Sequence, residues 1–144
     1  MRFYLDTCSL NRPWDDQNQV RVHLEAEAVR YLVRHGRLEL VSSDYLFDEI
    51  HDIPEPTRAD VLALTTAAAI QVRSHPAIVA RSETFAVHNI LDYDALHLAA
   101  AEAAACDYFF TTDGRLLRRT ARAAGLLKIK VLNPADWPPP SPLP

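Results

Sequence analysis

The sequence is poor in cysteine and has no long apolar run. Its two cysteines, Cys8 and Cys106, form no CxxC pair and lie in apolar or strand-edge contexts, which suits reduced packing residues better than a disulfide. A catalytic thiol is disfavoured too, because no histidine lies in an evident supporting motif. The longest uncharged apolar runs fall well short of the roughly 20 residues that a membrane helix needs. These absences argue against an oxidised, a thiol-dependent or a membrane-spanning protein.

A secretory signal is also missing. The N-terminal MRFYLD passes directly into a predicted strand, without a longer apolar stretch and a small-residue cleavage site. We therefore expect a cytoplasmic protein that does not bind membranes. The 144 residues, 49% of them apolar, fit one domain large enough to bury a core.

Lysine is rare, and the net charge is acidic. Of 15 basic residues only Lys128 and Lys130 are lysine, and the formal net charge is -4. Such a protein is at first a poor candidate for binding nucleic acid, because phosphate contacts are usually made by a basic surface. That objection weakens if acidic residues hold two divalent cations, which would offset the whole formal charge. Arginine suits bidentate phosphate binding, but a GC-rich coding sequence would give the same excess of arginine.

Strand and helix signals alternate along the chain. This alternation predicts the α/β class, with a parallel, doubly wound sheet. The chain ends in a segment with six prolines, residues 134–144, which we expect to be extended or disordered and separate from a domain at residues 1–133. The predicted strands are 2–5, 38–41, 70–73, 107–113 and 128–133, and the predicted helices are 22–35, 44–53, 57–69, 76–88, 92–105 and 115–124.

Several residues signal where these helices begin and end. Gly36 and Gly125 each follow a helical segment and are typical C-terminal stops. Thr57 with Asp60 three residues later resembles a capping box, and Asp92 is a candidate N-cap. Ser42 and Ser43 are good N-caps for the helix that follows them.

Two carboxylates follow predicted strands. Asp6 ends the first strand and Asp113 ends the strand of DYFFTTD. In an open parallel α/β sheet, ligands bind beyond the carboxyl ends of the strands, so both acids belong at the same edge if their strands are neighbours. The alternative is that each acid only caps the following helix, because Asp is favoured at that position.

A third acid lies on the apolar side of a helix. Projection of residues 44–52 places Glu49 on the same face as Tyr45, Leu46 and Ile50, with the neighbouring Asp44, Asp48 and Asp52 on a solvated face. A carboxylate that faces a core costs several kcal/mol unless it is paired or binds a metal. No basic residue lies within a helical turn of Glu49.

Asp94 is the fourth candidate, in the first turn of an alanine-rich helix. The small side chains let this helix pack closely on the sheet and bring its first turn to the crevice, although the helix dipole alone would also favour an acid there. Glu102 lies about two turns further, ~12 Å by helix rise, too far to share a metal with Asp94, and is read as a surface residue. His97 is read as a packing or surface histidine.

Carboxylates that meet at one crevice repel each other unless cations neutralise them. Hard oxygen ligands favour Mg²⁺ or Mn²⁺, whereas Zn²⁺ more often takes His or Cys, and the sequence has no HExxH and no paired CxxC. Such ions suit phosphodiester cleavage by an activated water, with no nucleophilic side chain.

The segments YLDTCSLNRP, SSDYLFDEI and LDYDALHLAAAEAAACDYFFTTD resemble the PIN-domain family, and within it the VapC-like toxins of bacterial toxin–antitoxin pairs. The likeness runs from residue 3 to about residue 133, and the proline-rich tail lies outside it. It implies a three-layer α/β/α sandwich around a five-stranded sheet of order 3-2-1-4-5, a Mg²⁺- or Mn²⁺-dependent endoribonuclease, an RNA substrate, a cognate antitoxin and a homodimer. The catalytic and metal-binding acids that it implies are Asp6, Glu49, Asp94 and Asp113, with Thr112 as a supporting hydroxyl.

An arginine-rich segment follows the last acid. If TTDGRLLRRTARAAG is helical, four arginines form one stripe while Leu116 and Leu117 face the core. We predict that this stripe binds RNA together with Arg12, although exposed arginines on a helix need no special reason. The stripe consists of Arg115, Arg118, Arg119 and Arg122.

Two other classes of function stay open. A phosphoacceptor receiver domain also gathers acids beyond strand ends, but it typically has two acids after its first strand, where this chain has Asp6 and Thr7. A PIN-like binding module without catalysis would keep the fold, and only a cleavage assay separates it from a nuclease.

Overall fold

Five parallel strands form the centre of the molecule, in the order β3-β2-β1-β4-β5. The computed structural model describes residues 1–35, 38–66 and 68–137. The parallel sheet and the predicted strand order are confirmed. The strands are β1 (Arg2–Leu5), β2 (Glu39–Ser43), β3 (Ile70–Val72), β4 (Tyr108–Phe110) and β5 (Lys130–Leu132).

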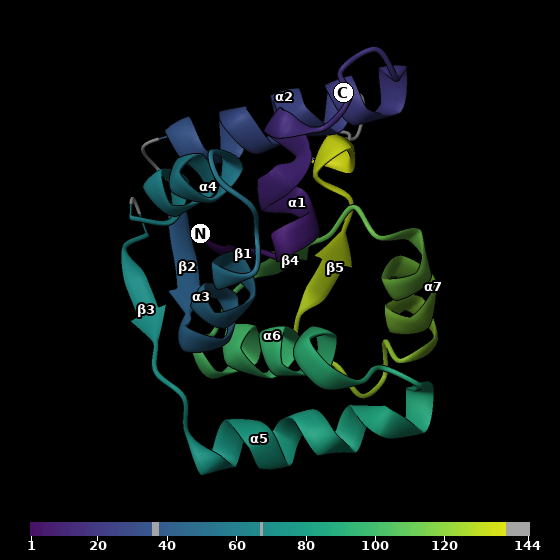
Figure 1. The fold of residues 1–144 in the computed structure, drawn as a ribbon. Coiled ribbons are helices and arrows are strands. Elements are labelled where there is room, and N and C mark those ends of the chain that lie inside the picture. The colour runs from purple at the N-terminus through teal and green to yellow at the C-terminus, as the bar shows by residue number, and fades with distance from the viewer. Residues whose placement is uncertain (36–37, 67, 138–144) are drawn as a thin grey trace.

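Helices cover both faces of the sheet, which gives the predicted three layers (Figure 1). α1, α2 and α4 lie on one side, and α5 and α6 lie on the other, while α7 lies beside β5. The helices are α1 (Thr7–Asn11), α2 (Val20–Arg34), α3 (Asp44–His51), α4 (Thr57–Thr65), α5 (Pro76–Glu83), α6 (Asp92–Ala103) and α7 (Gly114–Arg122), with 3₁₀ turns η1 (Arg12–Trp14), η2 (Thr84–His88) and η3 (Pro134–Asp136).

The core lies around β1 and β4. Phe3, Tyr4 and Leu5 are fully buried, because a central parallel strand is covered on both faces. Tyr4 stacks on Phe109 of β4 with ring centroids 5.4 Å apart. Four of the five alanines of α6 are also buried, all except Ala103, so this helix packs closely on the sheet as predicted.

Several predicted helix caps and ends are wrong. Thr57 does not cap α4: Pro56 is the N-cap residue, and the amides of Arg58 and Ala59 bond to the carbonyls of Pro54 and Pro56. The helix also ends earlier than predicted, at Thr65 and not at residue 69. Asp92 is the first residue of α6 and not its cap, with a left-handed φ of 51°. The predicted helix 76–88 divides into α5 and the 3₁₀ turn η2. The predicted stop at Gly36 lies outside the described residues.

The start of the proline-rich segment is not extended. Pro134–Asp136 forms η3, whose first turn is capped by the side chain of Asn133. Trp137 then packs against Tyr31 of α2, with ring centroids 6.2 Å apart. Residues 138–144 of the predicted tail lie outside the described part of the chain. Within the described part, no helix is long and apolar enough to cross a membrane.

Candidate active site

Asp6 and Asp113 lie at the same edge of the sheet. The register pairs Leu5 with Phe110, and the Asp6 amide donates to the Phe110 carbonyl at 3.2 Å, so the ends of β1 and β4 are tied together. β4 ends at Phe110, three residues earlier than the predicted strand end at Asp113. Thr111 and Thr112 carry the chain from the strand to Asp113, which is the N-cap of α7.

Both acids do cap helices, as the alternative interpretation held. Oδ1 of Asp6 accepts from the Ser9 amide at 2.9 Å, and Oδ1 of Asp113 accepts from the Arg115 amide at 2.9 Å. A carboxylate has about four acceptor positions, so one or two cap bonds do not exhaust it. Capping fixes the position of each carboxylate without excluding a ligand.

Asp6 is buried, and burial disfavours its charged form. Burial raises its pKa to about 6, and hydrogen bonds from Thr111 and Ser9 oppose this rise only in part. The charged carboxylate is therefore costly to keep at neutral pH unless a cation lies beside it.

Thr112 presents a hydroxyl that no described residue satisfies. The residue is buried and its Oγ1 makes no hydrogen bond, whereas the Thr111 hydroxyl accepts from the Asp113 amide at 3.1 Å. A buried hydroxyl without a partner is costly, and water or a bound ligand is the usual explanation. Thr112 directly precedes Asp113, so its unpaired hydroxyl belongs to the same loop as that predicted acid.

Glu49 is held by two side chains at one oxygen. Thr7 Oγ1 donates to Glu49 Oε1 at 2.6 Å, and His97 Nε2 contacts the same oxygen. Burial would raise the pKa of Glu49, but the hydrogen bond and the positive charge of His97, together with the hydrogen bond from Thr7, outweigh it and the pKa is lowered. The predicted apolar face is confirmed, since Tyr45, Leu46 and Ile50 are buried. Asp44 is not simply solvated, because it accepts from the Ser74 amide at 2.8 Å.

Asp94 is partly buried near the other charges. Burial raises its pKa, the negative charges of Asp113 and Glu49 raise it further, and the positive charge of Arg119 lowers it. Coulombic energy falls with distance, so Asp94 is electrostatically coupled to two of the other predicted acids and to one predicted arginine.

The negative charges of all four predicted acids act on the pKa of the Cys8 thiol. Although the residue as a whole is exposed, partial removal of the thiol from water raises the pKa of Cys8. The negative charges add to this rise in the order Asp6, Asp113, Asp94 and Glu49, and the pKa reaches about 12. Cys8 is an exposed residue of α1, so the packing role predicted for both cysteines holds only for the buried Cys106. The acids thus gather around the start of α1 from four separate parts of the sequence.

No closed metal cage is formed. Among residues 1–35, 38–66 and 68–137, no three His, Cys, Asp or Glu side chains are grouped so as to hold one ion. The chemistry of the donors nevertheless fits Mg²⁺ or Mn²⁺. These ions usually take one or two carboxylates and complete their shell with waters and substrate phosphates.

The predicted arginines fall into two groups. Arg12 is paired with Glu25 and Asp15, at 3.0 and 2.9 Å. The four arginines of α7 make no ion pair with any described residue, and all are exposed except the half-buried Arg119. Leu116 is buried as expected, while Leu117 is only half-buried.

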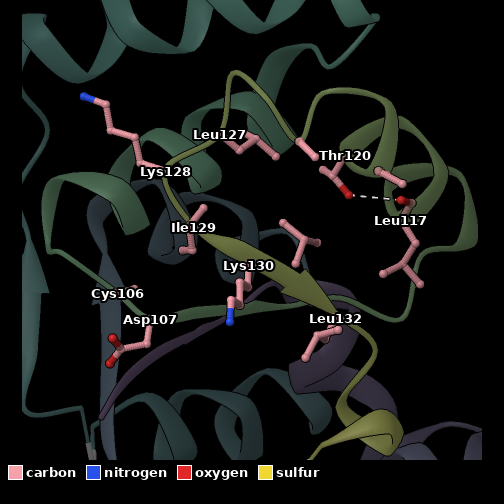
Figure 2. A pocket seen from close by; sticks show the side chains of 12 residues that line it. Cys106, Asp107, Leu117, Thr120, Leu127, Lys128, Ile129, Lys130 and Leu132 are labelled. Atoms are coloured by element: carbon pink, nitrogen blue, oxygen red, sulfur yellow. Dashed lines mark hydrogen bonds between the residues drawn. The ribbon is translucent and has the colours of Figure 1, made fainter. Parts of the chain in front are cut away.

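A separate cavity lies between α7 and β5 (Figure 2). It has a volume of about 610 Å³, and apolar side chains such as Leu117, Leu127 and Ile129 make up most of its wall. None of the four predicted acids lines it. The cavity is thus distinct from the acidic edge.

Sequence reasoning missed two charged networks. Glu102 is not a surface residue: its side chain is buried and forms a bidentate ion pair with Arg81, at 2.7 and 3.2 Å. Buried Glu25 accepts from Arg12, Arg21 and Asn133, and Arg21 also donates to the Thr112 carbonyl at 3.3 Å. The i, i+4 spacing of Arg21 and Glu25 was a usable signal for the second network.

His97 is the missed residue closest to the site. It is buried, as a packing residue would be, but it contacts Glu49 directly. Its i, i+3 spacing from Asp94 places both residues on one face of α6, which could have indicated this role.

The sequence matches no protein-family model, and a search of curated proteins found no match. Solved structures do resemble the chain. VapBC-1 from nontypeable Haemophilus influenzae matches with a TM-score of 0.61 at 16% identity, over 93% of this chain and 98% of the other. FitAcB from Neisseria gonorrhoeae matches with a TM-score of 0.58 at 16% identity, over 92% and 97%.

VapBC2 from Rickettsia felis, bound to a DNA fragment from its promoter, matches with a TM-score of 0.57 at 11% identity, over 92% of this chain and 98% of the other. Each likeness extends over nearly the whole of both chains, and the sheet has the order expected from the resemblance. The chain therefore has the PIN-like α/β/α fold.

Proposed function

We propose that this chain is a divalent-metal-dependent endoribonuclease and the toxin of a toxin–antitoxin pair. The observation that carries this proposal is the pairing of β1 with β4, whose tied ends bring Asp6 and the loop to Asp113 to the carboxyl edge of the sheet. The influence of Asp6, Glu49, Asp94 and Asp113 on the pKa of Cys8 supports it. Ligands of open parallel sheets bind at this edge. The similarity in fold to toxin–antitoxin proteins supports the same assignment.

The four acids would hold Mg²⁺ or Mn²⁺, and the Thr112 hydroxyl would orient a water or a phosphate oxygen beside them. Three features support this choice: hard oxygen donors, the raised pKa of buried Asp6, and the unsatisfied Oγ1 of Thr112. When bound, such an ion lowers the pKa of a coordinated water and stabilises the charge on the leaving oxygen.

The protein's own groups would prepare the site for a phosphodiester. The cap bonds from Ser9 and Arg115 hold Asp6 and Asp113 in place before RNA arrives. Arg119 lies near enough to Asp94 to influence its charge, so the α7 stripe starts at the acids and leads away from them. This stripe would hold the RNA backbone next to the carboxylates.

An antitoxin partner follows from the same proposal. Clustered carboxylates favour a basic partner, and an inserted arginine is a natural counter-charge for them. We expect the reading frame beside this gene to encode a short protein with a basic, amphipathic half that inhibits the nuclease. The lack of such a frame, together with normal growth on expression, would indicate a solitary nuclease. A homodimer belongs to the proposal as well and is tested by the mass of the purified protein in solution.

Incubation with a mixed RNA pool tests the activity. We expect cleavage with Mn²⁺ and none with chelator, and a DNA pool of the same composition tests the preference for RNA. A folded protein that leaves RNA intact at every Mn²⁺ concentration would support the PIN-like binding module instead. The receiver-domain alternative loses support from the strand order, because receiver-like flavodoxin folds have the order 2-1-3-4-5.

A further inference from the structure

His97 is clamped between the sheet and the acidic edge. It is buried on α6, and its ring lies 5.5 Å from the Tyr4 ring and 6.1 Å from the Tyr93 ring, measured between centroids. Both ring nitrogens are used: Nδ1 lies 2.6 Å from the Tyr4 hydroxyl, and Nε2 contacts Glu49 Oε1. His97 has no part in the metal binding or RNA binding proposed above.

The direction of each hydrogen bond follows from the chemistry of the partners. An ionised carboxylate only accepts, so Nε2 must carry the proton that it shares with Glu49. In a neutral imidazole Nδ1 is then an acceptor, and the Tyr4 hydroxyl donates to it.

The chain of hydrogen bonds continues to Ser43. The Tyr4 oxygen lies 2.7 Å from Ser43 Oγ, and because its own proton points to His97, it accepts from Ser43. Ser43 Oγ in turn accepts from the Leu46 amide at 3.1 Å as the N-cap of α3. Every donor and acceptor in this direction is satisfied.

The path therefore starts at the N-cap of α3, crosses β1 and α6, and returns to α3 at Glu49. These hydrogen bonds link the three elements directly. Thr7 donates a second hydrogen bond to the same Oε1 of Glu49. Neither contact involves Oε2.

We propose that His97 is a positioning residue, which holds Glu49 through a directed hydrogen-bond chain from Ser43 and Tyr4 so that Oε2 faces the acidic edge. The role of the positioned oxygen rests on the nuclease function proposed above. The hydrogen-bond chain itself does not depend on that function. Partners of this kind fix a ligand's orientation, and their loss typically costs about 10- to 100-fold in metal affinity or activity.

Two substitutions separate the two ring nitrogens. In His97→Gln the side-chain amide can reach the position of Nε2 and donate to Glu49. In His97→Asn the shorter side chain can reach only the position of Nδ1, so the donor to Glu49 is lost. His23→Asn, at an exposed position of α2, is the matched control.

Kinetics and metal binding give the first test. For His97→Asn we expect kcat on RNA to fall about 10- to 100-fold with little change in KM, and the Kd for Mn²⁺ measured by calorimetry to rise over a similar range. His97→Gln should stay closer to the wild type in both quantities, and His23→Asn should match the wild type. Equal behaviour of the Gln and Asn variants, whether both are active or both are impaired, would overturn the proposal.

Long-range ¹H–¹⁵N correlation spectra give a test that needs neither RNA nor metal. The signals that disappear in His97→Gln identify His97, and we expect its neutral form to carry the proton on Nε2. A proton on Nδ1 would overturn the proposed chain. If the wild type neither cleaves RNA nor binds Mn²⁺, the proposed nuclease function is wrong. The position of the ring proton in the neutral form of His97 would still show whether His97 donates to Glu49.

Discussion

Asp6 caps a helix and is a candidate metal ligand at the same time. The sequence left these two interpretations as alternatives, but the cap bond to the Ser9 amide falls on Oδ1 and leaves acceptor capacity on the carboxylate. Asp6 is thus held in position before a cation binds. Its buried negative charge is unfavourable until a cation lies beside it.

The raised pKa of Asp6 predicts how stability depends on pH. Between roughly pH 4 and pH 6 the native protein keeps a proton on Asp6 that the unfolded chain has released, so the free energy of unfolding falls as pH rises through this window. Asp6→Asn cannot ionise and keeps the cap, because Asn is as good an N-cap as Asp. We expect the variant to be more stable than the wild type by up to about 3 kcal/mol at pH 7.5 in chelator.

This gain should disappear near pH 4, and denaturant unfolding at a series of pH values measures it. Asp48→Asn, at an exposed position of α3, is the control and should follow the wild type throughout. A constant difference between Asp6→Asn and the wild type from pH 4 to pH 7.5 would argue against a buried, protonatable Asp6.

At this scale the sequence predicted the acids but not their partners. Asp6 and Asp113 both follow strands in the sequence. This local pattern was enough to single them out, although β4 ends three residues earlier than predicted. The partner of Glu49 lies 48 positions away on α6, and no local pattern relates the two residues. Glu102 was misjudged for the same reason, since Arg81 reaches it from another helix.

Helix α7 joins the acidic edge to an unpaired cationic surface. Its arginines make no ion pair within the described chain, and Arg119 already influences Asp94. Phosphate contacts release counterions, so each contact adds about 0.7 to the salt-dependence slope for single-stranded RNA.

Arg118→Ala with Arg122→Ala should therefore weaken RNA binding for all sequences and lower the slope by about 1.4. Binding is measured over a range of salt concentrations in Ca²⁺, to hold back cleavage. Arg34→Ala with Arg73→Ala, outside α7, is the matched control and should keep the wild-type slope. Equal slopes for both double variants would mean that α7 is only a solvated face.

Element boundaries were harder to predict than the elements themselves. Propensity and periodicity located every strand and every longer helix, because buried faces repeat regularly. The predicted N-caps of α4 and α6 were wrong, because Pro56 precedes α4 and Asp92 has a left-handed backbone, and the sequence pattern does not reveal this geometry. The 3₁₀ turn at Pro134–Asp136 depends on Asn133 and on packing against α2.

The whole molecule brings distant segments to one edge. The order β3-β2-β1-β4-β5 makes β1 and β4 neighbours, and this places Asp6 beside a loop more than 100 residues later in the chain. Alternation of strands and helices predicted the parallel sheet, while the order of the strands came from the family resemblance. The proposed site is thus a property of the topology as much as of the acids.

A cation bound at this edge should stabilise the entire fold. At a Mn²⁺ concentration of about 100 times Kd, mass action contributes about 2.7 kcal/mol, which corresponds to a rise in Tm of roughly 5 to 10 °C for a chain of this length. Asp6→Asn with Asp113→Asn should abolish the rise and should be the more stable protein in chelator. Thermal unfolding with and without Mn²⁺ measures both effects, and an equal rise in the double variant would place the ion elsewhere.

The rate of cleavage of one end-labelled RNA, followed as Mn²⁺ is titrated, tests the central proposal that these acids form a metal-dependent nuclease site. Asp94 caps no helix and has no described hydrogen bond to lose, so Asp94→Asn changes the site with little effect on the fold. We predict saturable cleavage by the wild type and by Asp48→Asn. The rate for Asp94→Asn should be at least about 100-fold lower, beyond the usual cost of removing an outer-shell partner. Cleavage by Asp94→Asn at the wild-type rate, or wild-type cleavage that persists in chelator, would contradict the proposal.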